Sequence, residues 1–237
     1  MRTHLPAFLA LAALAAPANT ATRNFGVESF DRVRVDGPFR VQLTTGVAPF
    51  ASASGSAAGL DRVDIDIQGR TLIVRANSSS WGGYPGKEAG PVEISIGTHE
   101  LTNAWLNGAG TLQIDKVRGF SFDLSVQGSG AVAIGETDVD QLRVSVAGMG
   151  SARLAGRAGK MTAVVRGVST LDAGELVTKD ASIGADGPAT VKANVTNAAK
   201  VAGSGVATIS LTGTPACTAK LAGSASVSGC KEAGSGY

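Results

Sequence analysis

Histidine and cysteine, which often carry catalysis or bind metals, are nearly absent from this chain of 237 residues. His99 is the only histidine besides His4, and it stands beside Glu100. One imidazole cannot form a multi-histidine metal site, and no Ser or Cys motif accompanies it to make a nucleophile and base pair. A surface histidine is the simpler interpretation. The sequence therefore predicts no catalytic residue, no metal site and no cofactor.

Carboxylates deserve a separate look, because two carboxyl groups form the catalytic set of many enzymes that cleave polysaccharides. The candidate acids fall at different positions of the strands and loops: Asp115, Asp123, Asp138, Asp140, Asp172, Glu175, Asp180 and Asp186. Glu136, Asp138 and Asp140 could meet in space. We interpret them as solvated loop charge, so enzymatic activity stays open with the balance against it.

Aromatic side chains make a better case for binding. Trp81 and Tyr84 lie in a glycine-rich stretch, residues 77–91, and exposed rings of this kind stack on sugars or anchor protein partners. The alternative is that both rings fold back over the core as a lid. Trp105 falls on the outward side of its expected strand and is a second candidate, although packing under an insertion would explain it equally well.

The fold that positions these side chains can be read from a short sequence phrase, which occurs seven times between residues 104 and 229. The phrases begin at Leu106, Val126, Val146, Val165, Ile183, Val201 and Leu221. Successive starts lie 18 to 20 residues apart, which is the signature of stacked repeats. Apolar residues alternate with polar ones around each phrase, so each unit reads as strand, corner, strand and return loop. We predict an all-β, single-domain parallel β-solenoid.

Glycines mark the predicted corners, because glycine accepts a positive φ and lets backbones approach closely. The predicted corner glycines are Gly37, Gly69, Gly108, Gly110, Gly128, Gly130, Gly148, Gly150, Gly167, Gly187, Gly203, Gly205 and Gly223. Dinucleotide-binding loops have similar glycine spacing, but they need a long helix after the glycines, and here another short strand follows. The spacing therefore does not indicate a phosphate site.

The coils before Leu106 are expected to be irregular. Gly37 follows an alternating run, so the solenoid is expected to begin near Phe30. A second irregular unit is expected around Gly69, with insertions on both sides of it because the glycine spacing there exceeds one coil. Residues 49–58 are expected to supply a further strand.

The chain has two cysteines, Cys217 and Cys230, and both fall in the last predicted coil. An exported protein meets oxidising conditions, so a disulfide between them is predicted, with two buried free thiols as the alternative. Closing so short a loop stabilises a chain by about 3 kcal/mol in the chain-entropy model. The bond would tie down a coil that has no following neighbour to cover its edge.

The start of the chain has the pattern of a secretory signal peptide over residues 1–18. Arg2 and His4 precede an apolar run too short to span a bilayer, and Ala16-Pro17-Ala18 forms a cleavage site. Residues 19–29 are expected to be an extended lead-in, 30–230 the solenoid and 231–237 a flexible tail, with no membrane span after cleavage. The formal net charge of +2 gives no reason to expect nucleic acid as a partner.

Three segments carry a resemblance to a known family: FDRVRVDGPFRVQLTTG, VDIDIQGRTLIV and VEISIGTHELTNAWLNGAGTLQI, followed by VxGxG coils. Together they resemble the family called putative autotransporter adhesin, head GIN domain, over about residues 30–230. The resemblance implies a bacterial exported β-helix of right-handed winding. The adhesin label of that family is itself an inference.

These observations leave three functions open. The leading hypothesis is a non-enzymatic, exported binding module in the periplasm or at the cell exterior, with a surface glycan or an envelope protein as its partner. The second is a carbohydrate-active enzyme of the polysaccharide-lyase type, which rests on fold analogy alone. The third is a purely structural envelope protein whose outer faces associate with one another.

Overall fold

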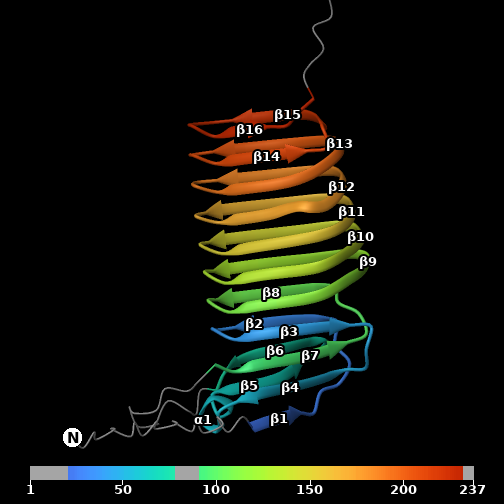
Figure 1. Ribbon diagram of the computed structural model, residues 1–237, viewed down its shortest axis with the longest axis vertical. Coiled ribbons are helices and arrows are strands. Elements are labelled where there is room, and N and C mark those ends of the chain that lie inside the picture. The colour runs from blue at the N-terminus through green and yellow to red at the C-terminus, as the bar shows by residue number, and fades with distance from the viewer. Residues whose placement is uncertain (1–20, 78–90, 232–237) are drawn as a thin grey trace, which may run out of the picture.

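The repeats form a parallel β-solenoid of about six turns in the computed structural model, which describes residues 21–77 and 91–231 (Figure 1). Five long strands make the regular coils: β9 (Thr111–Gly128), β10 (Ala131–Gly148), β11 (Ser151–Gly167), β12 (Thr170–Asp186) and β13 (Thr190–Ser204). The short elements before them are β1 (Ala21–Phe25), β2 (Arg32–Asp36), β3 (Arg40–Thr45), β4 (Phe50–Gly55), α1 (Ala57–Leu60), β5 (Val63–Gln68), β6 (Thr71–Ala76), β7 (Glu93–Thr98) and β8 (Asn103–Gly108). The chain continues through β14 (Thr208–Thr212), β15 (Ala216–Leu221) and β16 (Ser226–Ser228). The predicted all-β solenoid is therefore confirmed.

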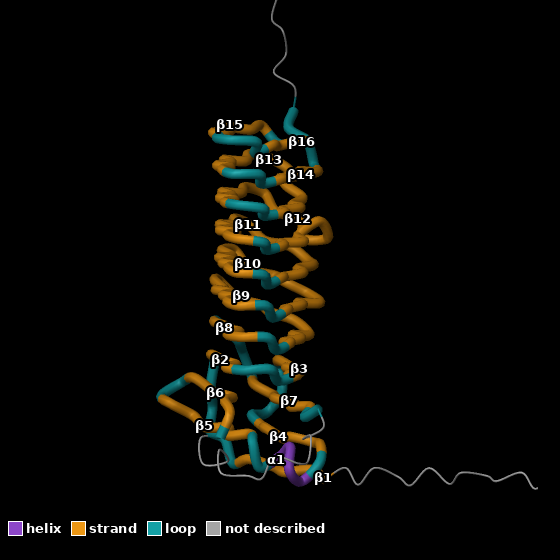
Figure 2. The backbone as a smooth tube through the Cα atoms, turned by 90° about the vertical axis from the view of Figure 1, so that its left-hand side faces the viewer, coloured by secondary structure: helices purple, strands orange, loops and turns teal. Residues whose placement is uncertain are grey.

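Each long strand bends once and contributes to two columns of parallel strands (Figure 2). The first part of β9 pairs with β3, as Leu112 does with Val41, and its last part pairs with β8, as Val126 does with Leu106. We call these the β3 column and the β8 column. The β3 column runs on through the long strands to β14 and β16, and the β8 column runs on to β15.

Inward side chains of the two columns fill a narrow core. At one level of the β8 column the stacked residues are Phe122, Leu142, Met161, Ala181 and Ala199, all of them buried. Side-chain volume falls along this series, so the core narrows toward the C-terminus. Burial of such apolar surface stabilises the stack by roughly 25 cal/mol per Å².

The corners of the coils require glycine for two different reasons. Gly108, Gly128 and Gly148 have φ values of 109°, 101° and 98°, which side-chain-bearing residues rarely adopt. Gly110 and Gly130 follow two residues later without a positive φ, but space is lacking there: a Cβ at Gly110 would lie 2.6 Å from the carbonyl oxygen of Gly37. Positive φ values also occur at the other stacked corners, Gly37, Gly167, Gly187, Gly205 and Gly223.

Gly203 does not lie at a corner, so the prediction for this residue is wrong. It pairs with Ala185 and faces the core, where the nearest atoms to an added Cβ are the side chains of Leu221, Ala225 and Ile209. The corner glycine of this coil is Gly205, which stacks on Gly187. The repeated phrase places Gly203 two residues away from its true level in the coil. The reason is that the late coils carry Ala185 and Gly203 at the inward position that Val165 holds earlier.

Gly69 is also wrongly predicted as a coil corner. It has a φ of 62° in the two-residue turn between β5 and β6, which pair antiparallel from Gln68 and Thr71 outward. A glycine at the first position of such a turn matches the twist of a hairpin. The expected second irregular coil is therefore a hairpin, and its strand β6 pairs in parallel with β2.

The N-terminal end of the β3 column is closed by antiparallel strands. The expected strand within residues 49–58 is β4, and it pairs antiparallel with β7. Part of the expected lead-in forms β1, which pairs antiparallel with β4. Parallel pairing begins with β7 and β3, so antiparallel strands cap the stack at its N-terminal end.

The predicted disulfide joins Cys217 and Cys230, with 5.6 Å between their Cα atoms. It closes the last coil, in which inward-register residues such as Ala219 and Leu221 remain exposed. Within residues 21–77 and 91–231, no helix has the length and apolar character needed to cross a bilayer.

Candidate binding face

Trp105 lies on the outer side of the β8 column. Its neighbours Ala104 and Leu106 are fully buried, so the alternation of the strand turns the indole outward, where it is half-buried. Trp105 pairs with Arg34 on one side and Ser125 on the other. We call the outward surface of the β8 column, together with β2 and β6, the Trp105 face.

A central line of residues runs along the Trp105 face, one from each strand. In spatial order these residues are Ile73, Arg34, Trp105, Ser125, Ser145, Val164, Gly184, Ala202 and Lys220. The five residues between Trp105 and Lys220 are small or short, whereas both ends carry large side chains. The surface is therefore low along the middle of this line, with the Trp105 indole at one end and the Lys220 ammonium group at the other.

This low middle is a shallow groove, which we call the central groove. A hollow of about 280 Å³ lies between Trp105 and Val164, and a second of about 380 Å³ runs from Val164 to Lys220. Val164 and Thr162 line both hollows, so the hollows adjoin along the line. Six strand spacings separate Trp105 from Lys220, which makes the groove roughly 29 Å long at about 4.8 Å per spacing.

A larger pocket of about 810 Å³ lies on the other side of Trp105. Its polar lining includes Arg34, Asp36 and Asn107, where Asp36 Oδ1 accepts hydrogen bonds from Arg34 Nε at 3.0 Å and Asn107 Nδ2 at 2.6 Å. Gln68 and Ile73 of the β5–β6 hairpin form its far wall, and this hairpin projects from the stack beside β2 (Figure 2). The indole thus separates two adjoining hollows.

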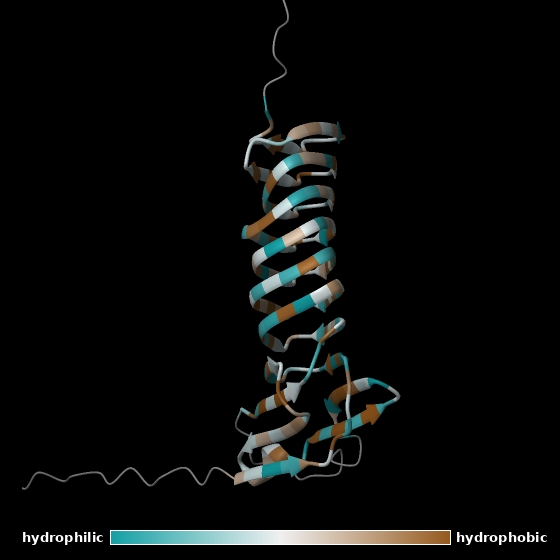
Figure 3. Ribbon diagram, turned by 90° about the vertical axis from the view of Figure 1, so that its right-hand side faces the viewer, coloured by the Kyte–Doolittle hydropathy of each residue, from teal (hydrophilic) through white to brown (hydrophobic). Residues whose placement is uncertain are grey.

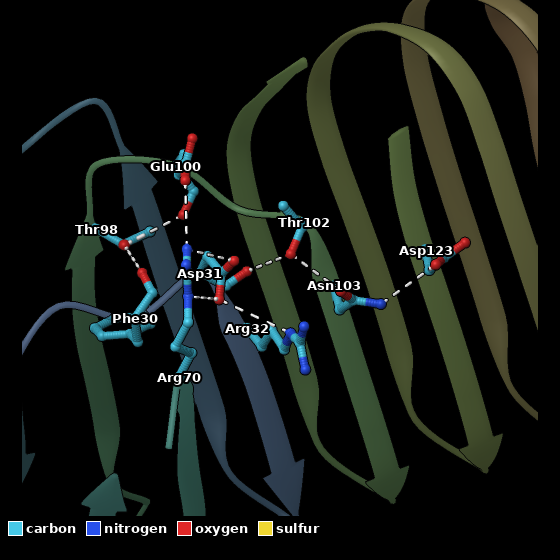
Figure 4. Close-up of polar contacts among 9 residues, drawn as sticks. All are labelled: Phe30, Asp31, Arg32, Arg70, Thr98, Glu100, Thr102, Asn103 and Asp123. Carbon is cyan, nitrogen blue, oxygen red and sulfur yellow. Dashed lines mark hydrogen bonds and ion pairs between the residues drawn. The ribbon is translucent and has the colours of Figure 1, made fainter. Parts of the chain in front are cut away.

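Asp31 holds this end of the Trp105 face together (Figure 4). Its carboxylate is 9% exposed and accepts two hydrogen bonds from Arg70, from Nε at 3.0 Å and from Nη2 at 2.7 Å. Its backbone carbonyl accepts from Thr102 Oγ1 at 3.0 Å. Because Arg70 lies in the hairpin turn and Thr102 precedes β8, one residue fixes both the hairpin and the strand that carries Trp105.

The same network extends along the strands. Thr98 Oγ1 donates to the carbonyl of Phe30, and Asn103 Nδ2 donates to Asp123 Oδ2 at 3.3 Å (Figure 4). Sequence reasoning missed Asp31. The available signal was a carboxylate between Phe30 and an alternating strand, a position from which a charged side chain must find a partner.

Charge is distributed unevenly along the central groove. Near Trp105, Asp123 forms an ion pair with Arg143 at 3.4 Å. Toward the other end, Lys200 and Lys220 line the groove, and Arg166 lines a hollow that adjoins it at Val164 and Lys220. All three are exposed and form no ion pair within the described part of the chain. Asp186, the acid at that end, accepts a hydrogen bond from Ser204 Oγ at 2.6 Å.

The outer face of the β3 column offers a second, more evenly polar surface. A hollow of about 500 Å³ there is lined by Arg40, Glu93, Arg153 and Asp172 among other residues. One outward line consists mainly of hydroxyl side chains: Thr111, Ala131, Ser151, Thr170, Thr190, Thr208 and Ser226. No aromatic residue of the described part of the chain lines this hollow, so the Trp105 face is the better candidate for binding.

Several of the candidate acids form ion pairs with arginines of neighbouring coils. Arg157 makes two hydrogen bonds to Asp138, at 2.7 and 2.8 Å, and these bonds lower the pKa of Asp138 and raise that of Arg157. Arg118 is held 2.9 Å from Glu136, which raises its pKa in the same way. Hydrophilic and hydrophobic bands alternate on the side where the long strands bend (Figure 3). The ion pairs of Arg157 with Asp138 and of Arg118 with Glu136 each join two adjacent coils.

The other sequence candidates are placed as follows. His99 and Glu100 are exposed, and Glu100 lies 3.6 Å from Arg70. Trp81 and Tyr84 fall outside the described residues. In the part of the chain that is described, no group of three or more His, Cys, Asp or Glu side chains could hold a metal ion.

Solved structures with the same fold extend over most of the chain. A putative adhesin from Bacteroides fragilis is 20% identical with a TM-score of 0.79, and the alignment covers 90% of this chain and 95% of that one. A putative lipid binding protein from Parabacteroides distasonis is 18% identical with a TM-score of 0.71, covering 89% and 96%. A putative adhesin from Parabacteroides merdae is 16% identical with a TM-score of 0.68, covering 89% and 96%.

Among curated proteins, no sequence matches this chain. The family described as "Putative auto-transporter adhesin, head GIN domain" matches residues 29–215, which include the β2–β3 coil, the Trp105 strand and the regular coils. The predicted resemblance is thereby confirmed. The chain belongs to the head GIN domain family of putative auto-transporter adhesins.

Proposed function

We propose that this protein is an exported, non-enzymatic binding module that holds an extended ligand in the central groove of the Trp105 face. The observation that carries this proposal is the groove itself, which runs along the stack for six strand spacings from an outward indole. Export is supported by the signal-like residues 1–18 and by the disulfide between Cys217 and Cys230. The adhesin descriptions of two structural relatives agree with a role in contact at the cell surface or in the periplasm.

The groove favours a long, linear ligand over a compact one. It is shallow and open, so it cannot enclose a small molecule, whereas a chain that lies along it meets one set of wall side chains at every strand. Hydroxyl and charged groups of the walls can bind sugar hydroxyls, and the Trp105 indole can stack on a sugar ring. A surface glycan is therefore the ligand class we expect.

The test uses two substitutions that act at different points of the groove. Trp105→Ala removes the ring, and Val164→Arg fills the floor where the two hollows meet. On an array of bacterial and host polysaccharides, we expect each variant to lose at least about tenfold in affinity for the bound glycan, the loss reported for removal of one well-packed anchor. Thr190→Arg, on the outer face of the β3 column, is the matched control and should bind normally. Unchanged binding by both groove variants would overturn the proposal.

A second candidate function is contact with lipid. Met149, Val168 and Val206 occupy the middle positions of three of four consecutive glycine corners, with Pro188 at the fourth, and are 69%, 62% and 57% exposed. They form an apolar edge beside the Trp105 face. Apolar side chains on a convex edge can insert between lipid headgroups. Vesicle binding that is lost in Val168→Ser but retained in Trp105→Ala would favour this candidate over glycan binding.

A carbohydrate-active enzyme that works through paired carboxylates needs those groups free to exchange protons with a substrate. Asp138, Glu136 and Asp123 are instead tied to Arg157, Arg118 and Arg143. Release of unsaturated sugars from pectin or alginate by the purified protein would support this alternative in spite of these ion pairs.

A further inference from the structure

We infer that the C-terminal half of the central groove binds the acidic groups of a linear anionic polysaccharide, with Arg166, Lys200 and Lys220 as the binding cations. The inference rests on the proposed function and goes further by naming the ligand charge and the residues that read it.

Among the described residues, these three cations, like Lys160 of β11, lack the ion pairs that the other arginines of the β8 column and its extensions make. Elsewhere on the β8 column and its extensions, Arg34, Arg75 and Arg143 each form an ion pair, at 2.9, 2.8 and 3.4 Å. Arg166, Lys200 and Lys220 have none within residues 21–77 and 91–231, although Asp186 lines the same hollow as Arg166 and Lys220. Three cations against one acid leave this half of the groove with a charge of +2, and an anion would complete it.

The cations surround the groove. Lys220 closes it at the end of the central line. Lys200 stands on one wall, in the outward line that continues to Thr218, and Arg166 stands on the other wall, in the line that continues to Asp186. A single chain in the groove therefore passes between Arg166 and Lys200 before it meets Lys220.

The spacing suits a sugar polymer. Lys200 and Lys220 belong to adjacent coils, about 4.8 Å apart along the stack, which is close to the length of one extended pyranose residue. Arg166 lies three coils before Lys220, about 14 Å away along the stack. Consecutive uronic acids would thus bring carboxylates to the level of each cation, while Trp105 offers a stacking surface at the far end.

Other polyanions match these features less well. Nucleic acid needs many phosphate contacts, and the chain has a formal net charge of only +2. An anionic membrane is a broad surface, whereas Lys200 and Lys220 line a hollow of about 380 Å³ between hydroxyl side chains. We therefore commit to a glycan with regularly spaced carboxylates.

The test compares two double variants with the same change in charge. Lys200→Ala/Lys220→Ala removes two groove cations, and Lys179→Ala/Lys192→Ala removes two exposed lysines outside the groove. Titration calorimetry on the full-length chain would use polygalacturonate and alginate as anionic probes and dextran as the neutral one. We expect the groove variant to bind polygalacturonate at least about tenfold more weakly, with less than about twofold loss in the control, since only the groove variant loses charge-assisted contacts to the ligand. Thermal unfolding should be the same for all three proteins.

The outcomes separate the inference from the proposed function. Equal losses in the two double variants would show non-specific attraction and overturn the inference. Dextran binding that requires Trp105 but not Lys200 or Lys220 would overturn the inference and leave the groove proposal standing. Tighter binding of single-stranded DNA, or of phosphatidylglycerol vesicles, with dependence on Lys200 and Lys220 would overturn the assignment to a glycan. Failure of every glycan to bind would overturn both.

Discussion

A single missing carbon atom decides whether consecutive coils can stack at their corners. Gly128 combines a φ of 101° with the carbonyl oxygen of Gly108 only 2.7 Å from where its Cβ would lie. The next residue, Ser129, points into solvent. Gly128 therefore cannot accept a side chain without a backbone shift, whereas the next residue, Ser129, carries one in solvent.

Gly128→Ala should lower the free energy of unfolding by at least about 2 kcal/mol, because it adds backbone strain and a contact that only a backbone shift can relieve. Ser129→Ala, the neighbouring control, should change it by no more than about 0.5 kcal/mol. Urea denaturation followed by circular dichroism measures both. If the two variants unfold at the same urea concentration, corner packing is not the constraint described here.

At the same scale, alternation along the chain was enough to predict which way Trp105 points, because its neighbours are both apolar. The floor of the central groove could not be predicted in this way. It depends on which residues of different coils share a level, and the phrases misalign by two residues in the fifth and sixth units. Gly184 and Ala202 become part of the floor only with the register that the structure supplies.

At the scale of the strands, the β5–β6 hairpin shows how one buried charge can fix an entire element. Arg70 in its turn is 64% exposed, whereas the Asp31 carboxylate that it binds is 9% exposed. If the ion pair were broken, Arg70 could be solvated, whereas the Asp31 carboxylate would remain buried without a partner. Local alternation predicted the two strands correctly, but the choice between a coil and a hairpin depended on the pairing of Gln68 with Thr71.

Asp31→Asn should destabilise the hairpin by about 1–3 kcal/mol, since it removes the negative charge and one of the two acceptors that bind Arg70 at a partly buried site. Asp64→Asn is the matched control, because Asp64 pairs with Arg75 within the same hairpin but is 40% exposed, so less than about 1 kcal/mol should be lost. Hydrogen exchange measured by mass spectrometry would report faster exchange in β5 and β6 for Asp31→Asn. Equal protection in the two variants would contradict a special role for Asp31.

At the scale of the whole molecule, stability should vary along the stack, because each coil contacts only its neighbours. The regular coils β9 to β12 have a neighbour on both sides, whereas β15 and β16 pair on one side only within the described residues. The period of the repeats was sufficient to predict this architecture. The antiparallel cap formed by β1 and β4 was not predicted, because neither strand carries the repeated phrase.

Cys217→Ser/Cys230→Ser should loosen the last coil and leave the rest of the stack intact. The bond closes a loop with a sequence separation of 13 residues, which corresponds to about 3 kcal/mol in the chain-entropy model. We expect hydrogen exchange to rise in β15 and β16 while the amides of β9 to β11 keep their protection. Val164→Ser, in the middle of the stack, serves as the control with intact ends. A uniform loss of protection along the chain would show that the coils unfold as one unit.

The central groove has a consequence for how such proteins can diversify. Every added coil contributes one more floor residue and one more pair of wall residues at the same spacing, about 4.8 Å. Duplication of a single repeat would thus lengthen the track without redesigning its cross-section. In this architecture the number of coils sets the length of the groove. The side chains at three outward positions of each coil set which ligand it binds.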